Sequence, residues 1–428
     1  MTMQIAICVA IFLFMIISLA LNKLAMGVTA LTALALLVLT GCVTAKDALG
    51  YFGNANVIII MGMFVIGEAL SRTSLITNIT HSIRKVTGGN FQLAYRGILI
   101  LAVIITSVLT SPMVSYAIVF PIMDSICDEF GVSRSKVHFP LAIVCVACCA
   151  ILPFGFAISE AAVFDGLMET YGFTQHFTAL DFTRGRWPMI IVVLIWAFFL
   201  AQKFTPEEPL VPIASMSSKK EERKPLTKSQ DLIGGIIFAG TILGLIFNAQ
   251  IGIAAWVIVL CGCMLNIIFG VISSKDAIRA LPVDIGMMFV GANAMASALV
   301  NTGAAALIGD KIAAFLGTNP SNWMLSIIFF LVPFILTQFM QNQGVMNIFA
   351  PICLLTCSAI GADPRGLLVL ICAGSLTAFM TPSATGAIPM MMGAGGYTIK
   401  SLAKMGWLIA VLLTLFYIPF VTLTMPAF

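Results

Sequence analysis

Long stretches without a single Asp, Glu, Lys or Arg recur along the whole chain and constrain its fold more than any other feature. They are residues 1–22, 24–45, 48–67, 97–123, 139–159, 187–202, 232–274, 285–309, 312–362, 366–399 and 405–428. About 20 apolar residues suffice for a helix to cross ~30 Å of hydrocarbon. Hydrophobic residues make up 60% of the chain and charged residues 9%, so no soluble core could hide this much apolar surface. The sequence therefore predicts an all-α polytopic membrane protein with about 10–11 spans.

Other broad features exclude several classes of protein. The net charge is only +4, and the basic residues lie between apolar runs, so nucleic acid is not an expected partner. The first apolar run has no basic region before it and no cleavage site, so we interpret it as a retained span. Cys145, Cys148 and Cys149 lie in an apolar run with no His nearby, so we expect neither a disulfide nor a structural metal.

Residues 204–230 differ from the rest of the chain because they are rich in Pro, Ser and charges of both signs. This composition predicts a solvated linker between two halves, residues 1–203 and 231–428. Lys and Arg concentrate in cytoplasmic loops of membrane proteins, and the linker carries Lys219, Lys220, Arg223, Lys224 and Lys228. We therefore expect a cytoplasmic linker, both termini outside, and an inner-membrane location in a bacterium.

The two halves resemble each other at a nearly constant offset of 229–231 residues. The matching pairs are Thr73 with Thr302, Pro121 with Pro351, Gly131 with Gly361, Arg134 with Arg365, and Pro153 with Pro382. A further match, Gly62-Met63 with Gly286-Met287, departs from this offset. With a cytoplasmic linker, equivalent helices run in opposite directions, which is the inverted-topology repeat of many secondary transporters.

Each half divides into the same series of segments. The first has scaffold spans 4–71, an interfacial amphipathic helix 73–89, a hairpin 91–130, a broken helix 137–170 and a span 187–203. The second has scaffold spans 231–300, a hairpin 322–360, a broken helix 365–396 and a span 405–425.

The two hairpins have uncharged tips, Thr110-Ser111-Pro112 and Gln341-Asn342-Gln343-Gly344. Each arm of about 17 residues spans roughly 26 Å as a helix. Such arms fit a re-entrant hairpin with a buried tip, although two short full spans also fit.

Each hairpin is followed by a helix that proline and polar residues interrupt, at Pro153 and at Thr381 to Thr385. Proline removes a backbone donor and disfavours helix at the residue before it. Unwound backbone at membrane depth is tolerated where it lines a cavity or is buried in protein. Matching breaks in two halves indicate a central binding site, and a simple proline kink is the alternative at each break.

At these segments the chain resembles the divalent anion:sodium symporter family of the ion transporter superfamily. That family carries Ser-Asn-Thr at each tip, about ten residues before a Pro. Counting back from Pro121 and Pro351 matches only Ser111 in the first tip and Asn342 in the second. The resemblance implies sodium as a coupling ion, a small organic anion as substrate, and a homodimer formed through the scaffold.

The tips and breaks supply the candidate site residues. For the substrate we expect hydroxyl and amide groups of Ser111, Ser115, Gln341, Asn342, Gln343, Thr381, Ser383 and Thr385. For a cation we expect side-chain and carbonyl oxygens at Thr110, Ser111, Pro153, Gly155, Asn342, Gly344 and Thr385. Free N–H groups at helix N-termini would bind the anion, because the predicted site contains no Lys or Arg.

A few polar residues within or beside the spans have open roles. Glu68 either couples protons or pairs with Arg72 one turn on. Glu160 and Asp165 follow the first broken helix, and we expect them to face the outer aqueous side. Asn293 has no obvious partner and either lines the site or ties helices together.

These features predict cation-coupled uptake of a di- or tricarboxylate by alternating access. A sodium/proton antiporter or an inorganic oxyanion transporter of the same superfamily is the alternative. An intramembrane enzyme is more remote, because no His lies at either helix break to activate a nucleophile or bind a metal. No cofactor is expected beyond the coupling ion.

Overall fold

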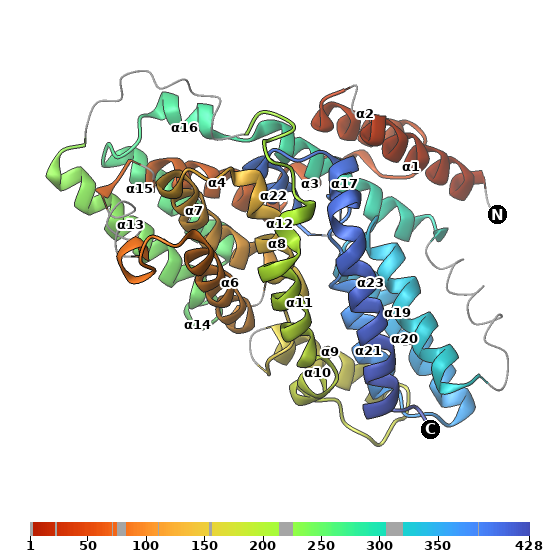
Figure 1. The fold of residues 1–428 in the computed structure, drawn as a ribbon. Coiled ribbons are helices and arrows are strands. Elements are labelled where there is room, and N and C mark those ends of the chain that lie inside the picture. Colours follow the sequence, from red (N-terminus) through yellow and green to blue (C-terminus); the bar gives the residue numbers. More distant parts are fainter. Residues whose placement is uncertain are drawn as a thin grey trace.

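The computed structural model describes residues 3–21, 24–70, 72–74, 83–109, 111–153, 156–213, 226–304, 320–383 and 385–428. Throughout these residues the regular secondary structure is helical (Figure 1). Four sets of predicted residues lie outside the described part. They are Thr110, Gly155, most of the predicted interfacial helix at 75–82, and the centre of the linker at 214–225.

The first half contains eleven described α-helices and one short 3-10 helix. They are α1 Met3–Leu21, α2 Met26–Leu39, α3 Ala45–Phe52, α4 Ala55–Leu70, α6 Phe91–Val108, α7 Pro112–Phe130, η1 Arg134–Lys136, α8 His138–Ala147, α9 Phe156–Thr170, α10 Ala179–Arg186, α11 Pro188–Phe199 and α12 Ala201–Phe204.

The second half repeats this order with ten described helices. They are α13 Lys228–Ile246, α14 Asn248–Ile251, α15 Ala255–Ile268, α16 Ser274–Ala280, α17 Val283–Asn301, α19 Asn322–Thr337, α20 Asn342–Ile360, α21 Arg365–Ser375, α22 Ala387–Gly395 and α23 Ile399–Thr424.

Four helical segments of the described chain are long and apolar enough to cross a membrane. They are Ala45–Leu70, Val283–Asn301, Asn342–Ile360 and Ile399–Thr424, and the pair α10–α11, bent by 50°, makes a fifth if it is one span. Six further apolar helical segments have 10–17 residues, and they include Phe91–Ser107 within α6, α19 and α21. Short apolar helices are typical of chains whose helices are broken or re-enter the bilayer.

Helix ends repeat between the halves with the offset seen in the sequence. Gly41 after α2 has φ +73°, and Gly270 after α15 has φ +71°. Gly131 and Gly361 end α7 and α20 with φ +66° and +69°. A left-handed residue after a helix is the usual place for glycine, because it lacks the Cβ that makes this conformation costly.

The packing of the scaffold shows that each half interlocks with the other. Helix α2 packs against α17, and α15 packs against α4, so each pair joins the two halves. A Cβ at Gly291 would lie 2.5 Å from the carbonyl carbon of Ala30, and one at Gly62 would lie 2.5 Å from Val259 Cγ1. Gly62 and Ala30 correspond to Gly291 and Val259 at the same offset of 229, so the two contacts are equivalent.

This reciprocity corrects one match made from the sequence. Gly62 corresponds by packing to Gly291, and its match to Gly286 was wrong, which explains the departure from the common offset. Close helix approach requires a glycine at this crossing, whereas the Gly-Met dipeptide recurs without a shared structural role. The predicted all-α membrane fold of two inverted repeats, each with a hairpin and a broken helix, is confirmed.

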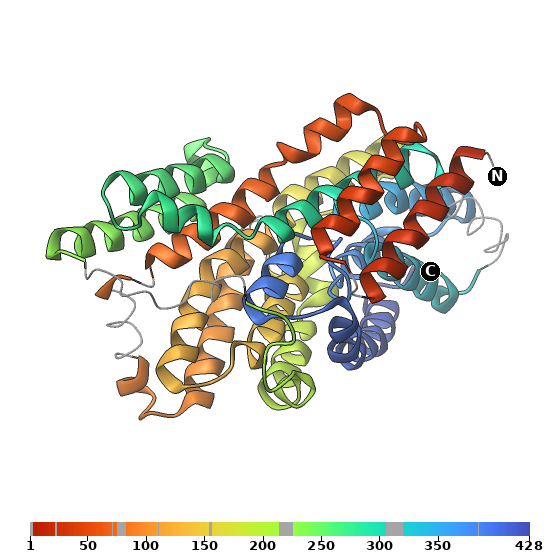
Figure 2. The same cartoon turned by 90° about the horizontal axis from the view of Figure 1, so that it is seen from above.

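The hairpin and broken-helix segments surround the middle of the molecule. Helices α6 and α7 lie on one side of α8 and α11 in Figure 1, and α19 and α20 lie on the other. The view in Figure 2, turned by 90°, shows the paired red helices α1 and α2 beside the second half. Helix α22 contacts both α7 and α8, so the second broken helix reaches into the first half.

Candidate functional site

Both predicted hairpin tips are the starting points of helices. Ser111 is the N-cap of α7 and Gln341 is the N-cap of α20, and both have extended backbone. Neither side chain accepts a hydrogen bond from the first turn. The N-cap of α22, Gly386, has no side chain that could do so. The first N–H groups of three helices are therefore left without side-chain caps where the tips and breaks lie.

Side-chain caps are present at some helices of the described chain, whereas α2, α8, α11, α12, α15, α17 and α21 also begin without one. Thr44, Asn90, Ser273 and Ser321 each accept a hydrogen bond from a backbone N–H in the first turn of the helix that follows. Such caps satisfy donors that a helix would otherwise leave free. The tip helices lack such a side-chain cap, and their N-termini carry the partial positive charge of a helix.

The first tip contacts both broken helices. The backbone N–H of Phe156, at the start of α9, donates to Leu109 O at 3.4 Å, which joins the tip to its own half. Met113, in the first turn of α7, packs against Gly386 at the start of α22, with its Cγ 3.1 Å from the place of a Cβ. A side chain at residue 386 would therefore displace Met113.

The second tip is bound to the break of its own half by neutral polar groups. Thr337 Oγ1 lies 2.8 Å from Ser375 O and 2.9 Å from Asn342 Oδ1, so its hydroxyl donates to one of them at a time. Gln338 Nε2 donates to Thr377 O at 3.2 Å, and Gln338 Oε1 accepts from the N–H of Met380 at 3.0 Å. These bonds to Gln338 replace helical hydrogen bonds for the backbone of the second break.

Gln343 connects the second tip to the first half by hydrogen bonds. Its Nε2 donates to both carboxylate oxygens of Glu160 in α9 at 3.2 Å. Glu160 is 3% exposed, so the expectation that it faces water was wrong. The sequence placed it after a broken helix, and only the packing of α20 against α9 shows that this turn faces the protein interior.

Asn293 of α17 links the scaffold to the second tip. Its Oδ1 accepts a hydrogen bond from Gln341 Nε2, and the residue is 2% exposed. Its Nδ2 is buried without a hydrogen-bond partner, as is the Oγ1 of Thr381 in the second break. Buried donors are nearly always satisfied in native proteins, so these two groups are suited to a bound solute.

The remaining predicted residues lie in the same region with simpler roles. Ser115 is fully buried and its hydroxyl donates to Ser111 O at 3.0 Å, within α7. Ser383 is buried, Thr385 is half-buried, and the carbonyl of Thr385 accepts from the N–H of Ile388 at 3.2 Å. Pro153 lies between α8 and α9, and Gly344 lies in the first turn of α20.

Glu68 forms an ion pair with Arg72. Arg72 Nη2 lies 3.6 Å from Glu68 Oε1 and 3.1 Å from Asp276 Oδ2 at the start of α16. The arginine thus joins α4 to the second half, which favours the structural role for Glu68 over proton coupling. Asp276 lies outside the spans, and its pKa is lowered by the hydrogen bond from Ser273 and by the charge of Arg72.

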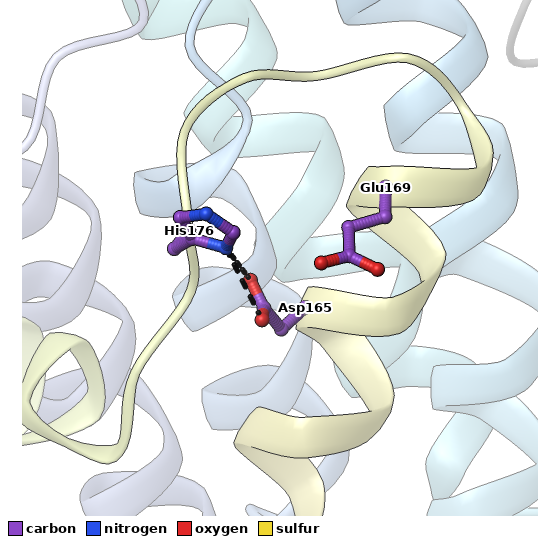
Figure 3. A group of neighbouring side chains, drawn as sticks. All are labelled: Asp165, Glu169 and His176. Atoms are coloured by element: carbon purple, nitrogen blue, oxygen red, sulfur yellow. Dashed lines mark hydrogen bonds and ion pairs between the residues drawn. The ribbon is translucent and has the colours of Figure 1, made fainter.

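A second group of ionisable residues lies away from the tips. Asp165, Glu169 and His176 place one ligand atom each within 4.8 Å of one another (Figure 3). His176 Nδ1 lies 3.2 Å from Asp165 Oδ1, which also accepts from the N–H of Phe177 at 2.8 Å. Glu169 and His176 are exposed, and the bonds tie the following loop to α9. We assign this group a structural role.

Sequence reasoning missed several residues at the site. Thr337 and Gln338 precede the second tip, and their polarity within the uncharged stretch 312–362 was the available signal. Glu160 was misplaced. Arg186 was not considered, yet it is fully buried and its Nη1 donates to Ala150 O at 3.1 Å, just before the first break.

The fold and the family define the class of protein: an integral membrane transporter built from two inverted halves. The chain belongs to the family described as the sodium:sulfate symporter transmembrane region, whose model matches residues 1–425. The resemblance found in the sequence is thereby confirmed.

Individual relatives are distant. An uncharacterized transporter of Synechocystis is 25% identical over 199 residues, which cover 45% of this chain and 32% of that protein. The sodium-dependent dicarboxylate transporter SdcS of Staphylococcus aureus is 20% identical and covers 93% of this chain and 82% of its own. The crystal structure of the YdaH transporter of Alcanivorax borkumensis is 15% identical, covers 88% of this chain and 86% of its own, and has a TM-score of 0.42.

Proposed function

We propose that the protein is a secondary active transporter that couples sodium to the uptake of a small organic anion, a di- or tricarboxylate, by alternating access. One observation carries this proposal. The helices α7, α20 and α22 begin without side-chain caps at the place where each hairpin tip meets a broken helix of the other half. The partial positive charge at three helix N-termini favours an anion without requiring Lys or Arg.

The polar groups at the tips complete the proposed site. Asn293 Nδ2 is an unused donor, and Ser111 and Asn342 lie at the starts of their helices. Carbonyl oxygens at the carboxyl ends of half-helices coordinate cations in broken-helix transporters. A sodium ion held there would offset the charge of the substrate. The names of the family and of the Staphylococcus relative, a sodium-dependent dicarboxylate transporter, support this choice.

Alternating access requires one part of the protein to move against another. The scaffold pairs α2–α17 and α4–α15 are locked by glycine contacts and form the fixed part. The hairpins and broken helices are joined to one another by side-chain hydrogen bonds and form the moving part. We place the domain boundaries at 1–203, 204–230 and 231–428, with a cytoplasmic linker, both termini outside, and a homodimer formed through the scaffold.

The experiment measures uptake of radiolabelled succinate, citrate and sulfate into proteoliposomes with and without an inward sodium gradient. We expect sodium-dependent uptake of at least one carboxylate. The test variant is Ser111→Asp, which puts a carboxylate where it caps α7 and competes with the substrate for the same N–H groups. Uptake should fall at least about tenfold while the folded state is kept, since one such competing hydrogen bond to a charge is worth about 1.5–3 kcal/mol.

The matched control is Ser321→Asp. Ser321 caps α19, and its hydroxyl already accepts from the N–H of Met324 at 3.2 Å away from the tips. This variant should transport at the wild-type rate. Wild-type rates for Ser111→Asp, or a protein that binds no carboxylate or sulfate with or without sodium, would refute the proposed site.

A second candidate concerns the coupling ion. Glu160 is buried and contacts Gln343 at the second tip, so a proton at this carboxylate could replace sodium. In that case an inward pH gradient drives uptake without sodium, and Glu160→Gln abolishes this uptake. Sodium-driven uptake that is unchanged in Glu160→Gln favours sodium coupling instead.

A further inference from the structure

The chain that leaves α12 lies along the start of the first broken helix before it reaches the centre of the linker. Ser135 is fully buried, and its hydroxyl donates to Pro206 O at 2.9 Å. Lys136 Nζ lies 2.6 Å from Glu207 Oε1. We call residues 205–211 the strap. Its first part is bound to η1, the short 3-10 helix that immediately precedes α8.

The second part of the strap is bound to the end of the second broken helix, α22, which lies beside α8 (Figure 1). The backbone N–H groups of Leu210 and Val211 donate to Gly396 O at 2.8 and 3.2 Å. Gly396 follows α22 with φ +68°, and a Cβ there would lie 2.6 Å from Pro209 Cβ. Glycine is needed for both this backbone conformation and this close approach. The strap thus connects η1 of the first half to the end of α22 of the second half.

Tyr397 makes a second connection between the same two elements. Its hydroxyl donates to Ser135 O at 2.6 Å and accepts from the N–H of Phe139 at 3.1 Å, and the residue is fully buried. Phe139 is the second residue of α8, and the N-cap of this helix, Val137, provides no side-chain cap. The first N–H groups of a helix need partners from outside it. The hydroxyl of Tyr397 therefore caps the first broken helix from the other half of the chain.

We propose that Tyr397 is a positioning residue that, together with the strap, ties the two broken helices to each other, so that both breaks move in one step during transport. This inference rests on the proposed function. If α8 and α22 separated, Ser135 O and the N–H of Phe139 would both lose a buried partner, and unsatisfied buried groups are costly. The tie therefore keeps either break from opening alone. Without it, sodium crosses the membrane without the substrate.

The first test is Tyr397→Phe, which removes only the hydroxyl group. The assay measures uptake of radiolabelled succinate or citrate, whichever the wild type transports, and entry of radioactive sodium without substrate, both in proteoliposomes. The maximal rate of uptake per folded molecule should fall at least about fivefold, the effect of one lost net hydrogen bond. KM should stay within about twofold, because the groups at the tips are unchanged. Sodium entry without substrate should rise.

The matched control is Tyr95→Phe. Tyr95 is also fully buried, and its hydroxyl donates to Ala197 O at 3.0 Å, but this bond joins α6 to α11 within the first half. Sodium entry without substrate should stay at the wild-type level in this variant. A merely structural Tyr397 predicts less folded protein with an unchanged rate per folded molecule and unchanged sodium entry. That result, or equal effects of Tyr397→Phe and Tyr95→Phe, would overturn the inference.

The strap is tested separately by Leu210→Pro, which removes the N–H that donates to Gly396 O. Leu210→Ala keeps this N–H and removes a side chain that is exposed, so it is the control. The proline variant should lose uptake and gain sodium entry as Tyr397→Phe does, and the alanine variant should equal the wild type. Wild-type behaviour of Leu210→Pro would refute the role of the strap. If Tyr397→Phe does not fold, this pair of variants decides.

Hydrogen exchange in detergent tests the tie without any transport assay. In Tyr397→Phe the peptide that contains Phe139 should exchange at least about fivefold faster, because its N–H has lost a buried acceptor. In Tyr95→Phe this peptide should exchange at the wild-type rate. Unchanged exchange in Tyr397→Phe would refute the cap on α8. A wild type that takes up no carboxylate refutes the proposed function, and the exchange rates then still decide whether the tie exists.

Discussion

The crossing of α2 and α17 gives the sharpest prediction about stability. A Cβ on Gly291 would lie 2.5 Å from the carbonyl carbon and 2.6 Å from the Cβ of Ala30, against a normal carbon–carbon separation of about 3.5–4.0 Å. The nearest atoms include backbone, so no rotamer change can relieve the clash. The two helices must separate by about 1 Å, and overpacking of this kind costs about 1–3 kcal/mol.

We therefore expect Gly291→Ala to lower the midpoint of thermal unfolding in detergent by several °C, at roughly 2–4 °C per kcal/mol. The matched control is Gly97→Ala on α6, where nothing lies within 4 Å of the added Cβ. Alanine favours helix over glycine by up to about 1 kcal/mol, so this control should be neutral or slightly stabilising. The reasoning fails if Gly291→Ala is as stable as the control.

Three further predictions concern the tips and the scaffold edge. Thr337→Val removes the donor to Ser375 O and should weaken sodium-driven uptake by about fivefold, for a neutral hydrogen bond of about 1 kcal/mol; uptake at the wild-type rate would contradict this. Gly386→Ala crowds Met113 and should slow uptake, which Met113→Ala should restore in the double variant; additive losses would contradict a direct contact. The folded-state pKa of Asp276 lies below its ordinary value of 3.8, so its stabilising contribution is present above that value and is lost as the pH falls through the lowered pKa. In Ser273→Ala, the midpoint temperature of unfolding should therefore fall less than in the wild type when the pH is lowered from about 5 into the acid range. An unchanged pH dependence would refute the assignment.

The ends of the helices beside the expected tips follow from local chemistry. Pro112 at the first position of α7 and the left-handed glycines after α7 and α20 fix helix ends by backbone sterics alone. The helices α19 and α20 fall within the range 322–360 for the same reason. Such signals depend only on residues that are adjacent in the sequence, so they can be recognised without the tertiary structure.

The partners of the tip residues could not be predicted in the same way. Gln343 contacts Glu160 and Met113 contacts Gly386, and the members of each pair are more than a third of the chain apart in the sequence. Nothing in the sequence near Glu160 shows that its turn of α9 faces α20 instead of water. The match of Gly62 to Gly286 failed for a similar reason, because a repeated dipeptide does not reveal which glycine lies at a helix crossing.

The sequence alone determined that this is a membrane protein of two related halves. Charge-free stretches require a lipid environment, and prolines restrict the backbone of adjacent residues, so both can be recognised without the tertiary structure. Only the tertiary structure decided how the halves interlock and that Arg186 lies at the end of α8. A buried charge is stabilised by whatever carbonyls and dipoles the folded chain brings to it. Those groups come from residues 36 and 39 positions earlier in the chain and from α23, so no local pattern could have indicated them.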